Sequence, residues 1–558
     1  MPASQHYQTD SPPSTRRAIL SAFLEQVSVY RVLLTGVLIG SCWVHSLGQT
    51  PGFVKQWDKT YGGDRADELH TLIPTQDGGY LAGGQSTSNA FGTRTQGSQG
   101  RTDYWLLKLD AQGMPQWDQR YGGDGYDEAW ALLQTSDGGY LIGGDSRKES
   151  MGGDKTQLGF GDYDFWVIKT SPTGVKQWDV TLGTGSPEHL TNLVETQDGG
   201  YLLAGESDNA YGVWKLSANG QTNWIRTYRA GSGLRWPATK LQTVQPTADG
   251  GFLLAGSATG GVFNDRTQPD RGGYDYWIVK IGALGQKEWD WAYGGPGDDE
   301  LRSCQPTPDG GYLLGGTTSS GIGGDKTQTS RGKKDLWLVK IDAAGTLQWE
   351  RRFGGQEDDI MGATRVIPGG YLVGASSWSP VSGDKTQPCW GYDDYWLLQL
   401  DLQGRLVREQ RYGSTSLDAL EALVLTRDGG CLLGGWSYSF RYGDKSEDNI
   451  GQVNFWLVKM APFLPLSTLK PTLTGEVRVA PNPAHDQLHF TIPAQPTMRV
   501  VTVVLLDAVG RQVKQEQYTG NLAATSATLP VRGLPAGVYY LRLEAPNQLI
   551  GMQRVLVQ

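Results

Sequence analysis

Carboxylates recur at one position of a repeated pattern, six residues after an aromatic residue. The residues at this position are Asp67, Asp127, Asp299, Asp359 and Asp418, with Glu188 as the equivalent residue in one further copy. Carboxylate oxygens are ligands that Ca²⁺ prefers, so a ring of such residues could bind that cation, and no other cofactor is indicated. In the alternative interpretation each carboxylate accepts backbone N–H groups in a sharp turn. We favour this structural role because a residue repeated in nearly every unit serves the repeat.

Aromatic side chains outside the repeated positions form a second candidate site. They lie in or beside the equivalent loop of each of the last two repeats. These residues are Trp378, Trp390, Trp436, Tyr438 and Tyr442. Flat aromatic faces with carboxylates and amides nearby are what sugar or peptide ligands use. Packing within the loop explains the same cluster, so both interpretations stay open.

Motifs for catalysis are scarce. Only four histidines follow residue 49, and neither H-E-x-x-H nor G-x-S-x-G is present. The hairpins that run from Asp110 to Trp117 and from Asp342 to Trp349 are similar to the tryptophan-docking repeat of quinoprotein propellers, and loosely to the Asp box of sialidases. Their Asp-to-Gly interval differs by one residue from both patterns. We therefore expect a binding protein without catalytic residues, with a quinoprotein-like enzyme or a glycan-active hydrolase or lyase as the alternative.

Three sequence markers recur between residues 52 and 460. A Trp-led strand ends in Gly-Gly, as in Trp57 to Gly63; an Asp-Gly-Gly turn begins at residues such as Asp77; and an aromatic-Trp pair opens another apolar strand, as at Tyr104-Trp105. Asp-Gly between two apolar runs predicts a hairpin, because the turn needs the positive φ that glycine accepts. Seven copies, each with four short β-runs, predict an all-β fold: a seven-bladed β-propeller whose first strand completes the last blade.

A Gly-Asp-Lys-Thr loop, or one close to it, recurs in most units. It begins at Gly153, Gly324, Gly383 and Gly443. The phasing of the strands predicts that this loop and the acidic turn emerge on one face of the ring. The third unit lacks the loop, which predicts a notch in that face.

Composition excludes one class of partner. The chain of 558 residues has 49 basic and 58 acidic side chains, a net charge of -9 and a pI near 5.3. A nucleic-acid-binding protein needs a basic footprint, so we expect no nucleic-acid partner.

The amino-terminal segment predicts export. The apolar stretch Val32 to Val44 follows Arg16, Arg17 and Arg31 and is shorter than the roughly 20 residues that span a membrane. We expect residues 1–48 to be a signal peptide and the mature chain to have no membrane span. Lipidation of Cys42 is the alternative. The remaining cysteines, Cys304, Cys389 and Cys431, are too few and too scattered for a disulfide framework.

The repeated pattern ends at residue 460, and a different kind of sequence follows. Residues 461–475 contain three prolines and predict a linker. Residues 476–558 contain six short alternating runs, which predict a small β-sandwich of immunoglobulin-like type.

Four short motifs in residues 476–558 carry a family resemblance. They are Ala480-Pro481-Asn482-Pro483, the segment from Leu506 through Gly510 to Arg511, the segment from Leu534 through Gly537 to Tyr539, and Arg554 to Val557. In order and position this segment resembles the type A carboxyl-terminal sorting domain of proteins exported by the type IX secretion system of Bacteroidota.

The resemblance implies a partner and a location. It implies Sec export to the periplasm, recognition of residues 476–558 by the outer-membrane translocon, and release or anchoring at the cell surface, often with removal of the domain. We therefore expect a secreted or cell-surface protein whose ligand is a glycan or another protein.

Overall fold

The computed structural model describes residues 53–147, 151–231, 238–463, 479–492, 500–507, 512–519, 525–545 and 548–558. The predicted signal peptide, Cys42, Gly510 and most of the predicted linker lie outside these ranges. The described residues form strands and turns and contain no helix. No helix in this part of the chain is therefore long and apolar enough to cross a membrane.

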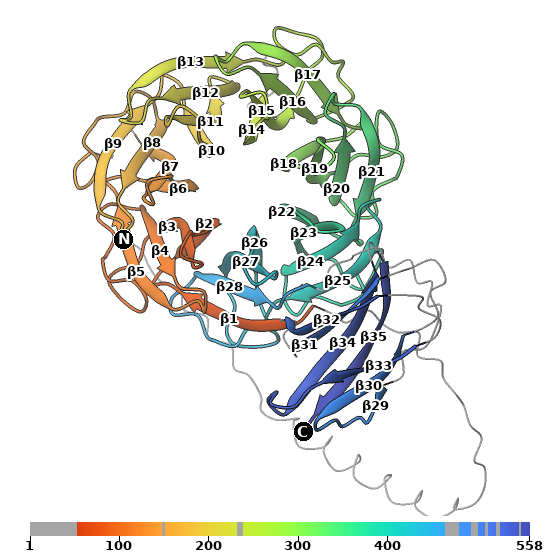
Figure 1. Ribbon diagram of the computed structural model, residues 1–558. Helices are drawn as coiled ribbons and strands as arrows, with labels where there is room; N and C mark the ends of the chain where they lie inside the picture. The colour runs from red at the N-terminus through yellow and green to blue at the C-terminus, as the bar shows by residue number, and fades with distance from the viewer. Residues whose placement is uncertain are drawn as a thin grey trace, which may run out of the picture. The chain divides into compact units, whose positions relative to one another are not determined.

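Residues 53–463 form seven four-stranded antiparallel sheets arranged around a central axis (Figure 1). The first three hold β2 (Asp67–Pro74), β3 (Tyr80–Ser86), β4 (Asp103–Leu109) and β5 (Pro115–Tyr121); β6 (Asp127–Gln134), β7 (Tyr140–Arg147), β8 (Tyr163–Thr170) and β9 (Lys176–Leu182); and β10 (Glu188–Glu195), β11 (Tyr201–Ser207), β12 (Ala210–Leu216) and β13 (Thr222–Tyr228).

The next three sheets repeat this order. They hold β14 (Thr239–Pro246), β15 (Phe252–Ala258), β16 (Asp275–Ile281) and β17 (Lys287–Tyr293); β18 (Asp299–Pro306), β19 (Tyr312–Thr318), β20 (Asp335–Ile341) and β21 (Leu347–Phe353); and β22 (Asp359–Ile367), β23 (Gly370–Ser377), β24 (Asp394–Asp401) and β25 (Leu406–Tyr412). In Figure 1 the first strand of each sheet faces the centre and the fourth lies at the rim.

The last of the seven sheets combines the two ends of the repeat region. Strands β26 (Asp418–Leu425), β27 (Cys431–Ser437) and β28 (Asn454–Met460) are joined by β1 (Lys55–Tyr61), which pairs antiparallel with β28 and places Tyr61 opposite Phe455. This is the pairing that the phasing of the repeats predicts. Along the inner circle β2 contacts both β6 and β26, so the succession of inner strands is continuous.

Repeated aromatic residues explain how each sheet is stabilised. The tryptophan of every third strand is fully buried, and Trp105 donates its indole N–H to Asp118 on the adjoining rim strand at 3.2 Å. The tyrosine beside it reaches the next sheet, since Tyr104 donates its hydroxyl to the carbonyl oxygen of Trp166 at 2.9 Å. A buried indole and phenol need such partners, and the repeat supplies them between neighbouring sheets.

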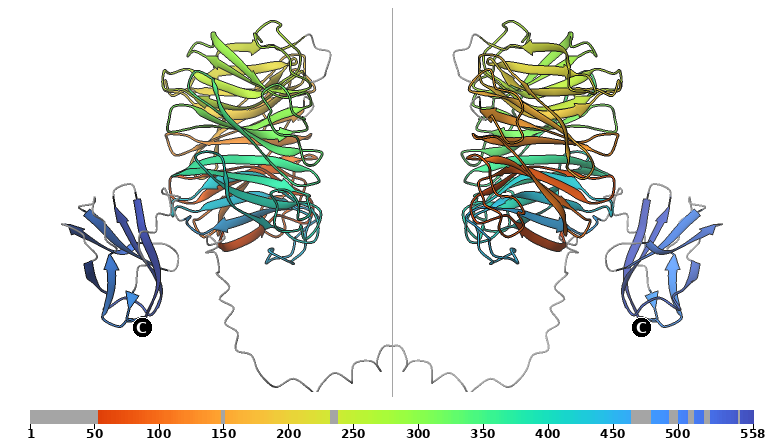
Figure 2. Two further views of the ribbon diagram at one scale, coloured as in Figure 1. Left: turned by 90° about the vertical axis from the view of Figure 1, so that its right-hand side faces the viewer. Right: turned by 90° about the vertical axis from the view of Figure 1, so that its left-hand side faces the viewer.

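The turns also follow the sequence. Gly78 follows Asp77 in the turn between β2 and β3 and has a φ of +90°, a conformation that residues with a side chain rarely adopt. Figure 2 shows the ring of sheets from the side, with connecting loops on both of its faces.

The carboxyl-terminal segment folds into two further sheets, and all six predicted strands are present. One sheet holds β29 (Val479–Ala480), β30 (Gln487–Ile492) and β33 (Thr525–Pro530); the other holds β31 (Val500–Asp507), β32 (Gln512–Thr519), β34 (Gly537–Ala545) and β35 (Gln548–Val557). Alternating apolar residues of both sheets, including Leu488, Phe490, Val503 and Leu541, share one buried core.

Candidate functional site in the central channel

The inner strands of all seven sheets line a cavity of about 460 Å³. The residue at the fourth position of each inner strand differs from sheet to sheet: these residues are His70, Trp130, Thr191, Gln242, Arg302, Gly362 and Glu421. The third residue of each strand is by contrast a buried leucine, alanine or methionine. A register shift separates the third residue from the fifth in every copy, for example between Leu69 and Thr71. Such bulges redirect a side chain, and here they place the variable residue in the cavity wall.

An ion pair joins two neighbouring sheets at this cavity. His189 Nδ1 on β10 lies 2.8 Å from Oδ2 of Asp145 on β7, and Asp145 Oδ1 accepts the backbone N–H of Leu190 at 2.8 Å. The hydrogen bond to Asp145 raises the pKa of His189 to about 9. The imidazole of His189 is therefore positively charged at neutral pH.

The second histidine of the cavity, His70, has the opposite protonation state. His70 stacks on Trp130 with ring centroids 3.9 Å apart and planes 8° from parallel. Burial lowers the pKa of His70 to about 4, so its imidazole is neutral. Its Nδ1 donates to the carbonyl oxygen of Ala129 at 3.2 Å, which leaves Nε2 as an acceptor.

A charged pair spans three sheets along the cavity wall. Arg302 Nη2 on β18 lies 2.6 Å from Glu421 on β26, although β22 lies between these strands. The intervening strand has Gly362 at the equivalent position, so no side chain stands between the two charges. A Cβ at Gly362 would lie 2.6 Å from the carbonyl oxygen of Leu420, which explains why glycine is required there.

A smaller hollow of about 300 Å³ lies beside the third sheet and shares His189 with the cavity. It also contains Arg147, Tyr163 and Glu206. Strands β11 and β12 are joined by only Asp208 and Asn209, both with positive φ, where other sheets carry a long loop. The hollow therefore lies where the missing loop predicts a notch.

Two glutamates near His189 are held partly protonated at neutral pH. Burial raises the pKa of Glu128 on β6 and of Glu206 on β11 to about 7 in each case. The nearby carboxylate of Asp145 raises both values further, whereas His189 lowers them. Such groups can donate or accept a proton near pH 7.

The structure places the aromatic residues predicted as a ligand site in three separate ring pairs. Trp390 meets Tyr442 of the next loop edge to face at 5.4 Å, and Trp378 meets Tyr392 at 6.1 Å. Trp436 and Tyr438 instead form their own pair at 5.7 Å. Trp436 lies on β27, opposite Ala419 of β26 and Phe455 of β28, whereas Tyr438 follows the end of that strand.

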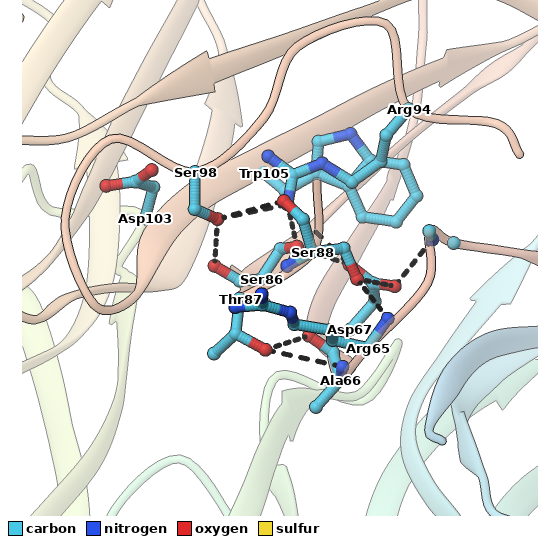
Figure 3. A network of polar contacts seen from close by, with 12 residues as sticks. Arg65, Ala66, Asp67, Ser86, Thr87, Ser88, Arg94, Ser98, Asp103 and Trp105 are labelled. Atoms are coloured by element: carbon cyan, nitrogen blue, oxygen red, sulfur yellow. Dashed lines mark hydrogen bonds and ion pairs between the residues drawn. The ribbon is translucent and has the colours of Figure 1, made fainter. Parts of the chain in front are cut away.

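The predicted Ca²⁺ ligands lie in separate sheets, one in each. Asp67 accepts the backbone N–H of Gly63 at 2.7 Å and the hydroxyl groups of Ser86 and Ser88, and Arg94 lies beside it (Figure 3). The other four are also fully buried and accept the N–H of the residue four positions earlier: these are Asp127, Asp299, Asp359 and Asp418. Among the described residues no group of three or more acidic, histidine or cysteine side chains could hold a metal ion.

The hairpins similar to docking repeats have a local role in the structure. Asp110 Oδ1 accepts the backbone N–H groups of Gln112 and Met114, at 2.9 and 2.8 Å. Asp342 accepts those of Ala344 and Thr346 in the same way. Both carboxylates thus stabilise their own turns.

The motifs at the carboxyl end come together in space. Asn482, between Pro481 and Pro483, accepts the backbone N–H of Leu556 at 2.8 Å through its side-chain oxygen. Tyr539, two residues after Gly537, donates its hydroxyl to the carbonyl oxygen of Pro535 at 2.8 Å. Residues 478–558 match the family described as the secretion system C-terminal sorting domain. This segment is a sorting domain. It implies export to the cell surface or the extracellular space and contact with the secretion machinery.

The other similarities of the chain are weaker. The regulatory protein FlaEY of Caulobacter vibrioides is 24% identical over 294 residues, which cover 47% of this chain and 30% of that protein. The chain thus spans less than a third of FlaEY.

Two solved structures are similar at low sequence identity. The Pan2 WD40 domain of Neurospora crassa is 10% identical over 70% of this chain and 88% of its own, with a TM-score of 0.39. The plexin A4 extracellular region is 9% identical over 91% and 67%, with a TM-score of 0.43. These similarities carry no inference about function.

Proposed function

We propose that this protein is an exported glycan-binding module. Residues 52–460 form its body, a closed seven-bladed β-propeller, and residues 476–558 form an immunoglobulin-like sorting domain that the type IX translocon recognises after removal of the signal peptide. The seven four-stranded sheets and the pairing of β1 with β28 support the closed ring. The two-sheet core of the sorting domain supports the sandwich.

The observation that carries the binding function is the exposed pair of Trp390 and Tyr442 from two neighbouring loops. Together with the exposed pair of Trp378 and Tyr392 we call it the aromatic surface. The side chains of Trp390 and Tyr442 are 47% and 52% exposed. Exposed aromatic side chains that meet in neighbouring loops mark an interaction site, and flat rings match the apolar faces of sugars.

The orientation of the Trp390 side chain is fixed before a ligand binds. The guanidinium carbon of Arg411 lies 4.6 Å from the centre of the Trp390 ring, and Tyr442 meets that ring at its edge. A ring held on two sides loses little conformational entropy when a ligand stacks on it.

A glycan array followed by calorimetry on the full chain tests the proposal. Trp390→Ala and Tyr442→Ala are each expected to weaken the best glycan by about tenfold or more. Trp291→Ala is the matched control, since Trp291 on β17 is 36% exposed and lies outside these loops. Unchanged affinity in the Trp390 and Tyr442 variants would remove the aromatic surface as the binding site.

One observation favours the enzyme alternative, a glycan-active hydrolase or lyase. Burial raises the pKa of Glu128 and of Glu206 to about 7, and both interact electrostatically with His189, which lines the smaller hollow together with Glu206; an acid and base pair would need such groups. Release of reducing ends or unsaturated products from a glycan that binds, and loss of that release in Glu206→Gln, would identify the enzyme. The quinoprotein alternative would show a visible absorption band.

A further inference from the structure

One guanidinium of the central cavity lacks a carboxylate partner. Arg365 on β22 lines the cavity beside Gln305, and its Nη1 donates to the carbonyl oxygen of Thr364 at 2.8 Å. Among the ion pairs formed by the described residues, none includes Arg365, whereas Arg302 is paired with Glu421. Arg365 is thus hydrogen-bonded but not neutralised.

The other charges of the cavity wall cancel. His189 is neutralised by Asp145 and Arg302 by Glu421, while His70 is uncharged at neutral pH. Burial lowers the pKa of Arg365 to about 10, which still leaves it charged at pH 7. The charged residues that line this cavity therefore sum to one net positive charge, on the partly buried guanidinium of Arg365, which an anion could neutralise.

The remaining polar lining consists of neutral donors and acceptors. Its amides and hydroxyls are Asn192, Gln242, Gln245, Gln305, Thr71, Thr191, Thr243 and Ser303. Groups that both donate and accept suit a ligand rich in hydroxyl groups. A volume of about 460 Å³ lies within the range of roughly 300–1,000 Å³ that small-ligand sites occupy.

We propose that the central cavity binds a hydroxyl-rich ligand with a single carboxylate, of the uronic acid class, and that Arg365 pairs with this carboxylate. The planar guanidinium can form two parallel N–H···O bonds with a carboxylate. The surrounding amides and hydroxyls bind the ring hydroxyls. This site lies in the channel and is independent of the aromatic surface at the loops.

Calorimetric titration of the full chain with glucuronate, glucose and acetate tests the charge and the hydroxyl requirement together. Glucuronate is expected to bind at least about tenfold more tightly than glucose or acetate, and its affinity should fall as NaCl is raised. Glucose binding equal to that of glucuronate would overturn the role of the charge. Acetate binding equal to that of glucuronate would overturn the role of the hydroxyl-binding wall.

Variants locate the site. Arg365→Gln should abolish the preference for glucuronate over glucose, and Arg365→Lys should retain part of it, because lysine keeps the charge without the fork. Arg351→Gln is the matched control, since Arg351 on β21 also donates to the carbonyl oxygen of the preceding residue, at 2.7 Å. Retention of the preference in Arg365→Gln would overturn the assignment.

Two further results keep the test decisive. The comparison of three ligands on the unmodified chain does not depend on any variant, so it stands even if Arg365→Gln does not fold. Trp390→Ala should bind glucuronate as the unmodified chain does. A loss there would show that glucuronate binds at the aromatic surface and would overturn the cavity site.

Discussion

Asp145 lies 2.8 Å from Nδ1 of His189 and connects two neighbouring sheets at the wall of the channel. Its second oxygen accepts the backbone N–H of Leu190, so a single buried carboxylate fixes both the side chain and the backbone of β10. A charged, hydrogen-bonded pair of this kind sets the protonation state of the wall as well as its geometry.

Replacing the carboxylate should change how His189 titrates. In Asp145→Asn the pKa of His189 is expected to fall from about 9 toward its usual value of 6.5, because the amide neither carries charge nor stabilises the imidazolium. The measurement is an NMR titration of the imidazole C–H signals. His70 is the internal control, because burial holds its pKa near 4. A His189 value that stays near 9 would show that Asp145 is not its cause.

Stability should depend on the charge of His189. Its pKa is higher in the folded chain than in the unfolded chain, so its contribution is complete below about pH 6.5 and is lost as the pH rises to about 9. The urea midpoint is therefore expected to fall more steeply between pH 6.5 and 9 in the unmodified chain than in His189→Gln. Parallel curves for the two proteins would contradict this expectation.

The buried turn carboxylates should matter far more than exposed ones. Asp67→Ala removes the acceptor of Gly63, Ser86 and Ser88 and the carboxylate that is ion-paired with the buried guanidinium of Arg94. Loss of one partner of such a pair costs about 3–5 kcal/mol of unfolding free energy. Asp64→Ala is the control, because exposed Asp64 accepts two hydrogen bonds from Asn89 at the same turn. Equal urea midpoints for the two variants would refute the role of the buried network.

The glycine between Arg302 and Glu421 should tolerate no side chain. Gly362→Ala places a methyl group 2.6 Å from the Leu420 carbonyl oxygen, and such overpacking costs about 1–3 kcal/mol. Gly185→Ala is the matched control, since an added Cβ there meets nothing within 4 Å. The measurement is the thermal unfolding midpoint of both variants. Equal midpoints for Gly362→Ala and Gly185→Ala would show that neighbouring residues move to accommodate the added methyl group.

The sorting domain should be necessary and sufficient for the last step of export. Deletion of residues 478–558 is expected to leave the chain inside the cell envelope, because the segment that contacts the secretion machinery is gone. Cell fractionation with an antibody to the repeat region measures this. A periplasmic reporter fused to residues 478–558 is the converse control and should appear outside the cell. Export of the truncated chain would contradict the assignment.

The repeats were predictable because each depends on local physics. Asp-Gly turns such as Asp77-Gly78 need positive φ, and Trp-led strands bury one face, so both leave a signature within a few residues of the chain. The turn aspartates accept hydrogen bonds from residues four positions away, a local pattern that led the sequence to favour a structural role over Ca²⁺ binding.

The aromatic cluster was only partly predictable. Neighbouring loops bring Trp390 and Tyr442 together, but Trp436 and Tyr438 pair with each other at the end of β27. Proximity in sequence could not distinguish these groups, because the direction of a side chain depends on its strand register.

By itself the sequence determined the repeated strands, their turns and the sorting domain, since short-range periodicity encodes all three. Only the tertiary structure decided the channel site. Part of its wall, from His70 to Glu421, comes from a repeated position whose identity changes in every copy, and that variation is a signal in the sequence. Other wall residues, such as Asp145, His189 and Arg365, come from different positions of their strands. Closure of the ring brings those residues onto one wall, and no local pattern records a contact between strands so far apart in the chain.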